Sequence, residues 1–85
     1  MNTIEHIRRL LKDNFLTAAH VEGFWRRPSA APEDKARFYA RVHLPSGHLI
    51  SCSEGRISDE VSVEALVWDK LYRHLRDYLN EPWTV

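Results

Sequence analysis

Residues 37–53 read RFYARVHLPSGHLISCS, two stretches of alternating apolar and polar residues around a proline–serine–glycine sequence. Proline suits the second position of a type I turn, and Gly47 suits the left-handed conformation that completes a three-residue hairpin loop. The pattern therefore predicts an antiparallel hairpin with strands over residues 37–44 and 48–53. Its register pairs Val42 with Ile50 and Ala40 with Cys52, so that turn chemistry and hydrophobic pattern agree.

The predicted hairpin separates two sets of side chains, because successive residues of a strand point to opposite faces. One face carries apolar or small residues, which are Phe38, Ala40, Val42, Leu44, Ile50 and Cys52. The other carries mostly polar and aromatic residues, which are Tyr39, Arg41, His43, Leu49, Ser51 and Ser53. We expect the first face to lie on the core and the second to remain open.

Residues 18–26, before the hairpin, also alternate and predict a third strand. Its open-face positions are His20, Glu22, Phe24 and Arg26. Gly23 is a position where a bulge would reverse the facing of the residues beyond it. A first helix that continues as far as His20 is the competing interpretation. The prolines and small residues of 28–35 predict a loop.

Helical spacing of apolar residues predicts one helix at each end of the chain. The helix over residues 3–15 has an apolar face formed by Ile4, Ile7, Leu10, Leu11 and Phe15. The helix over residues 59–79 begins at a cap formed by Ser58, Asp59 and Glu60, or by Ser62. Its expected core stripe is Val61, Ala65, Trp68, Leu71, Tyr72, Leu75, Tyr78 and Leu79. Val63 and Leu66 project away from this stripe, with Val67 at its margin. They either form a contact patch on the surface or tuck under the hairpin or the 28–35 loop.

These elements predict a single α+β domain over residues 1–85, in the order helix, three-stranded antiparallel sheet, helix, with both helices on one sheet face. The charges balance at 12 basic and 12 acidic residues, which is atypical of a general nucleic-acid binder. Cys52 is the single cysteine, and no apolar run approaches the length of a membrane span. We therefore expect a cytoplasmic protein with no membrane partner.

No arrangement of residues predicts catalysis, a metal or a cofactor. Cys52 lies roughly 13 Å along the strand from His48, too far for a nucleophile and its base. The five histidines lack the clustered spacing of zinc ligands. Asp59 and Glu60 sit where a helix cap is expected. We predict a non-enzymatic protein with no cofactor.

A non-catalytic, protein-binding module is the function that this pattern favours: an adaptor, a small subunit or an inhibitor of a larger complex. Its size also fits the small host-interfering proteins that phages and mobile elements encode. The predicted partner-binding residues are Phe24, Arg26, Tyr39, Arg41 and His43 on the open face, and Val63 and Leu66 on the second helix. One alternative is a nucleic-acid-binding domain that uses the same arginines and aromatic rings. Another is an obligate homodimer through the second helix.

The element order resembles that of the double-stranded-RNA-binding domain, which also has a glycine before its second helix. That resemblance concerns layout and implies an RNA contact at the start of the second helix. The family has a lysine-rich segment there, whereas this chain has residues 55–60, GRISDE, whose acids repel phosphates. We therefore predict neither membership of the family nor binding to duplex RNA.

Overall fold

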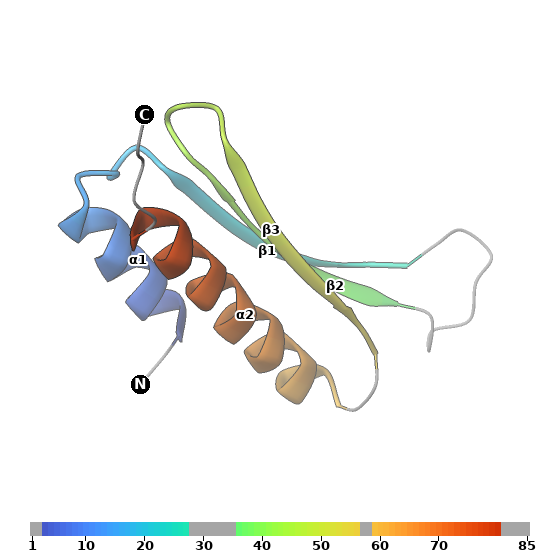
Figure 1. The fold of residues 1–85 in the computed structure, drawn as a ribbon. Helices are drawn as coiled ribbons and strands as arrows, with labels where there is room; N and C mark the ends of the chain where they lie inside the picture. Colours follow the sequence, from blue (N-terminus) through green and yellow to red (C-terminus); the bar gives the residue numbers. More distant parts are fainter. Residues whose placement is uncertain (1–2, 28–35, 57–58, 81–85) are drawn as a thin grey trace.

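A computed structural model describes residues 3–27, 36–56 and 59–80. The elements in chain order are α1 (Thr3–Asp13), β1 (His20–Arg26), β2 (Arg37–His43), β3 (Leu49–Gly55) and α2 (Glu60–Asn80). The strands form one antiparallel sheet with β2 in the centre, and both helices lie on one side of it (Figure 1). The predicted α+β architecture is therefore confirmed. The predicted 28–35 loop and the proposed capping residue Ser58 lie outside the described residues.

The β2–β3 hairpin has the predicted turn and register. Gly47 adopts a left-handed φ of 93°, and its N–H donates to the Leu44 carbonyl at 2.9 Å. The Leu44 N–H donates to the His48 carbonyl at 2.9 Å, which closes the three-residue loop. Val42 then pairs with Ile50 and Ala40 with Cys52, as the sequence predicts. A core-facing and an open side of the hairpin follow directly from this local geometry.

β1 pairs with β2 along its full length without a bulge, and it begins at His20 rather than at residue 18. Gly23 therefore keeps the regular alternation of the strand. A Cβ atom at Gly23 would overlap the indole ring of Trp68 on α2 and would lie 3.0 Å from Cζ of Phe38. Glycine is needed here because a helix side chain packs directly against the strand backbone.

α1 ends at Asp13, two residues earlier than predicted, because the chain turns at Phe15. Phe15 has a φ of 60°, and its N–H donates to the Lys12 carbonyl at 3.0 Å. The Leu16 N–H donates to the Leu11 carbonyl at 2.8 Å, which completes a Schellman C-cap. The prediction that Phe15 belongs to the apolar face of the helix is wrong, since the residue is 93% exposed.

The core lies between the helices and the sheet surface that faces them. Its buried residues are Ile7 and Leu11 of α1, Phe38, Ala40, Val42, Leu44 and Ile50 of the hairpin, and Val63, Val67, Leu71 and Leu75 of α2. Trp25 and Trp68 pack against this core, and the Trp25 indole N–H donates to the Glu64 carboxylate at 2.8 Å. The predicted open and core-facing surfaces of the hairpin are confirmed.

α2 buries a different stripe in its first half from the one predicted. Val61 is 74% exposed and Ala65 is exposed, whereas Val63 and Val67 are buried. The later part of the predicted stripe is confirmed, because Leu71 and Leu75 are buried. The cap is also confirmed at Asp59, whose carboxylate accepts the Ser62 N–H at 3.0 Å.

Candidate functional site

The sheet surface that faces away from both helices is the strongest candidate for a binding site, and we call it the open face. Alternate residues of all three strands project from it: His20, Glu22, Phe24 and Arg26 from β1, Arg37, Tyr39, Arg41 and His43 from β2, and Leu49, Ser51 and Ser53 from β3. The helices pack against the opposite surface (Figure 1). Within the described ranges, no helix or strand covers the open face.

An aromatic pair occupies the middle of the open face. Phe24 and Tyr39 are register partners on neighbouring strands, and their rings stack with centroids 5.5 Å apart and planes at 17°. The guanidinium carbon of Arg41 lies 5.1 Å from the Phe24 ring centroid and 5.8 Å from that of Tyr39. Each such cation–π contact is worth about 0.5–1 kcal/mol at an exposed site. The rings therefore hold the arginine in one position on the surface.

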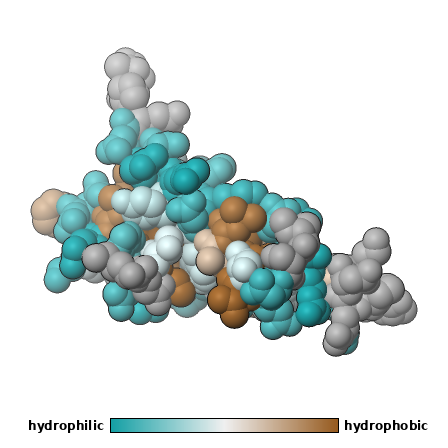
Figure 2. Space-filling view, turned by 90° about the horizontal axis from the view of Figure 1, so that it is seen from below, coloured by the Kyte–Doolittle hydropathy of each residue, from teal (hydrophilic) through white to brown (hydrophobic). Residues whose placement is uncertain are grey.

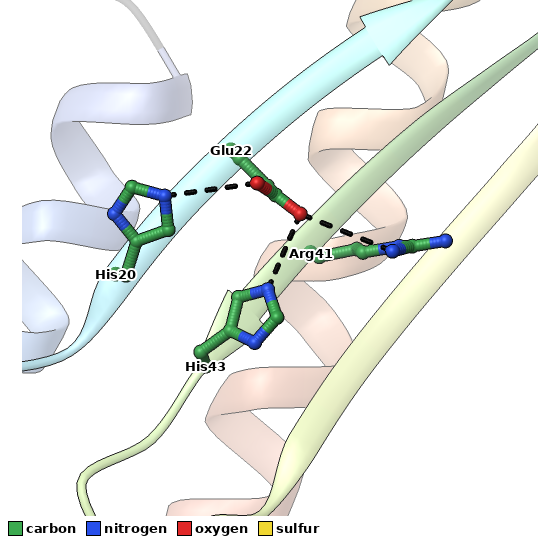
Figure 3. A network of polar contacts seen from close by, with 4 residues as sticks. All are labelled: His20, Glu22, Arg41 and His43. Atoms are coloured by element: carbon green, nitrogen blue, oxygen red, sulfur yellow. Dashed lines mark hydrogen bonds and ion pairs between the residues drawn. The ribbon is translucent and has the colours of Figure 1, made fainter. Parts of the chain in front are cut away.

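Glu22 joins three basic side chains, those of His20, Arg41 and His43 (Figure 3). Its carboxylate lies 3.2 Å from His43 Nε2, 3.6 Å from His20 Nε2 and 3.9 Å from Arg41 Nη1. The hydrogen bond with His43 is the main cause that holds the pKa of Glu22 below its usual value, and partial burial opposes this effect. The carboxylate is therefore ionised at neutral pH, and it contacts the same Arg41 guanidinium that lies against the rings.

Two further arginines lie at the far end of the same surface. Arg26 and Arg37 face each other across β1 and β2, and Arg37 Nε donates to the Ser53 hydroxyl at 3.0 Å. Neither forms an ion pair with another described residue. With Arg41, the described part of the open face carries three arginines and one carboxylate, that of Glu22. These described residues therefore have an excess of positive charge, which attracts negatively charged groups.

Most of the predicted partner-binding residues lie together. Phe24, Tyr39, Arg41 and His43 form one connected cluster on the open face, and Arg26 lies on the same face at the end of β1. The prediction that Val63 contributes to a surface patch is wrong. Val63 is 1% exposed and belongs to the core.

Exposed apolar residues remain at the start of α2. Leu66 is 38% exposed, as predicted, and Val61 and Ala65 are also exposed, whereas Val63 is buried. Figure 2 shows hydrophobic surface near the middle of its view, bordered by hydrophilic surface. α1 lies beside the second half of α2, where the rings of His6 and Tyr72 are 6.0 Å apart (Figure 1). The start of α2 therefore has no described helix beside it.

Sequence reasoning placed His20 and Glu22 on the open face but did not include them among the binding residues. The alternation of β1 shows which way they point. Their proximity to His43 depends on the register between β1 and β2, which pairs His20 with His43 and Glu22 with Arg41. Residues 28–35 connect these strands, and a long connection does not specify a register as a tight turn does.

The described residues offer no group of three or more histidine, cysteine, aspartate or glutamate side chains that could hold a metal ion. Cys52 is partly buried, and burial raises the pKa of its thiol. The thiolate that a nucleophile requires is therefore disfavoured at this position. The arrangement on the open face is suited to binding, through aromatic rings and positioned charges.

No protein family model, curated protein or solved structure matches this chain. Among the described residues, no helix has the length and apolar character needed to cross a membrane.

Proposed function

We propose that this protein is a protein-binding module that contacts its partner through the open face, as an adaptor, a small subunit or an inhibitor of a larger complex. The observation that carries the proposal is the stacked pair of Phe24 and Tyr39 with Arg41 against both rings. Tyrosine and arginine are enriched at binding hot spots, where aromatic rings fill pockets on the partner. Rings and guanidinium are already held in place, so binding orders few additional side chains.

The charges of the open face favour an acidic partner surface. Arg26 and Arg37 lie at one end of the face, and Arg41 lies in the middle. Glu22 neutralises part of this charge around Arg41, which limits the attraction to arrays of phosphates. A protein surface with an apolar pocket and nearby carboxylates would complement both the rings and the arginines.

A nucleic-acid-binding domain remains the second candidate, because bases stack on exposed aromatic rings beside arginines. The two functions differ in their response to salt. Affinity for nucleic acid falls steeply as salt increases, since bound counterions are released from the phosphates. Affinity for a protein that contacts Phe24 and Tyr39 depends less on salt. Gel shifts with single-stranded and double-stranded probes would separate the two, and we expect no shift with either.

The proposal is tested by affinity purification from the native host with the double variant Tyr39→Ala, Arg41→Ala. We expect the wild-type protein to retain a partner that mass spectrometry identifies and that the double variant loses. With the purified partner, the variant should bind at least about 30-fold more weakly, the effect of losing a hot spot of ~2 kcal/mol. Circular dichroism should show that the variant remains folded.

Arg73→Ala is the matched control, because Arg73 is exposed on α2 and its guanidinium pairs with Asp69 on the same helix. This variant should retain the partner with unchanged affinity. Equal retention by the wild-type protein and the double variant would exclude the open face as the binding surface.

A further inference from the structure

A hollow of about 460 Å³ lies between α1 and β1, at the edge of the sheet. Its lining residues are Arg8, Leu11 and Lys12 of α1, Leu16, Thr17 and Ala19 of the connection, and His20 and Val21 of β1. α1 packs against α2 and diverges from β1, which leaves this space along the edge of the sheet (Figure 1). The volume is within the range of small-molecule sites, about 300–1,000 Å³.

The floor of the hollow is apolar and continuous with the core. Leu11 is 4% exposed, and Leu16, Ala19 and Val21 pack against the buried cluster. The C-cap at Phe15 brings Leu16 to this position, because its N–H returns to the Leu11 carbonyl. An apolar group placed here would lose contact with water on several sides.

The rim of the hollow is cationic. Arg8 and Lys12 are four residues apart on α1 and therefore neighbours on one helix surface. Neither forms an ion pair with another described residue, and no acidic residue of the described ranges lines the hollow. Two adjacent cations without a counter-charge repel each other, and a bound anion would remove this repulsion.

The wall formed by β1 adds a backbone donor. In an antiparallel ladder, alternate residues direct both backbone groups to the neighbouring strand. The hydrogen bond from the Leu44 N–H to the His48 carbonyl shows which alternate residues of β2 bond with β3, and the residues between them bond with β1. The register of β1 with β2 then places His20 and Glu22 at positions that bond with β2. The N–H and C=O of Val21 therefore point away from β2, at the edge that borders the hollow.

We propose that this hollow binds a small amphipathic anion, an aliphatic carboxylate whose tail lies on Leu11, Leu16 and Val21. Its carboxylate is placed between Arg8 and Lys12. An inorganic anion would leave the apolar floor exposed to water, and an apolar molecule would leave the two cations without a partner. The site is distinct from the proposed protein-binding residues, because Phe24, Tyr39 and Arg41 do not line the hollow and His20 alone belongs to both surfaces.

The test is a titration of the full-length, isotope-labelled protein with sodium decanoate below its micelle concentration, followed by amide NMR shifts. We expect saturable shifts at Leu11, Leu16, Ala19 and Val21. Acetate, which has the charge without the tail, should bind at least about tenfold more weakly, since burial of apolar surface contributes ~25 cal/mol per Å². Decyltrimethylammonium, which has the tail with the opposite charge, should not shift these amides.

Paired charge reversals complete the test. The double variant Arg8→Glu, Lys12→Glu should weaken decanoate binding at least tenfold. Arg9→Glu should not, because Arg9 is exposed on the same helix but does not line the hollow. Ala19→Phe, which fills the hollow, should also block binding. Three outcomes would each overturn the proposal. The first is an equal loss of affinity in the double variant and in Arg9→Glu. The others are shifts centred on Val61 and Leu66, and the absence of saturable shifts at millimolar decanoate.

Discussion

Phe15 shows how one residue ends a helix at an energetic cost. Its φ of 60° is a conformation that glycine adopts readily, and the Cβ atom of other residues makes it unfavourable by about 1–2 kcal/mol. The ring offers no compensation through burial, because the residue is 93% exposed. The two hydrogen bonds of the C-cap hold this conformation, and they place Leu16 under the α1–β1 hollow. The strained residue thus supports the floor of a candidate site.

Replacing Phe15 by glycine should stabilise the protein. The left-handed conformation would carry no Cβ penalty, although the more flexible unfolded chain offsets part of the gain. We expect the free energy of unfolding to rise by ~0.5–1 kcal/mol, which corresponds to about 3–6 °C in Tm for a domain of this size. Thermal unfolding followed by circular dichroism would measure the change.

Phe15→Ala is the control for this prediction. It removes the exposed ring but keeps the Cβ atom, so its Tm should remain close to that of the wild-type protein. A lower Tm for Phe15→Gly than for Phe15→Ala would show that the ring stabilises the fold in a way that its exposure does not indicate.

The elements of the sheet differ in how their pairing is specified. Three residues, Pro45, Ser46 and Gly47, set the register of β2 with β3 through the geometry of the turn. The β1–β2 pair has no such turn among the described residues. Its register depends on packing, including Trp68 against Gly23 and the stack of Phe24 on Tyr39. The same register brings Glu22 to His43, so this cluster is a consequence of strand pairing.

The contacts of the Glu22 carboxylate with His20, His43 and Arg41 predict that the folded state loses stability in acid. Because the folded-state pKa of Glu22 is below its usual value of 4.5, the ionised carboxylate stabilises the folded state above that pH. This contribution is lost as the pH falls through the lower folded pKa. We therefore expect Glu22→Gln to lose less stability than the wild-type protein between about pH 5 and pH 2 in chemical denaturation.

His43→Asn tests the cause of this shift. It removes the ring that lies 3.2 Å from the Glu22 carboxylate, which is the main cause of the lowered pKa. In this variant the carboxyl resonance of Glu22 should titrate at higher pH than in the wild-type protein. An unchanged titration would assign the shift to Arg41 or His20 instead.

At the scale of the whole molecule, the position of the sheet determines which side of α2 is buried. The first half of the helix has two apolar stripes, Val61 with Ala65, and Val63 with Val67. The sheet covers the second stripe, and α1 lies beside only the later part of the helix. This arrangement leaves Val61 and Leu66 on the surface. Because Val63 is buried, the hypothesis of a homodimer through α2 now depends on these two residues.

Two aspartate substitutions should distinguish a buried position of α2 from an exposed one. Val63→Asp places a carboxyl group at a site that is 1% exposed, and we expect a loss of several kcal/mol, comparable to the whole stability of about 5–15 kcal/mol. Leu66→Asp should change stability by only about 0.5 kcal/mol. Circular dichroism would show an unfolded first variant and a folded second one.

Sizing chromatography of Leu66→Asp also tests the homodimer. A wild-type dimer that this substitution converts to a monomer would support an interface through α2, whereas equal elution volumes would exclude it. Unfolding by Leu66→Asp with a folded Val63→Asp would contradict the assignment of the buried stripe.

The sequence alone determined the features that depend on neighbouring residues. The hairpin around Pro45–Gly47, the two faces of its strands, the cap at Asp59 and the order of the elements all follow from local turn chemistry and periodicity. Most of the candidate site could therefore be predicted, since alternation places Phe24, Tyr39 and Arg41 on the open face.

Tertiary structure decided the features that require two elements to meet. The burial of Val63 in place of Val61 depends on where the sheet lies under α2, and the cluster around Glu22 depends on the register of β1 with β2. The α1–β1 hollow depends on the direction in which Phe15 turns the chain. Periodicity shows which residues of an element share a face, but only packing against another element determines which face is covered.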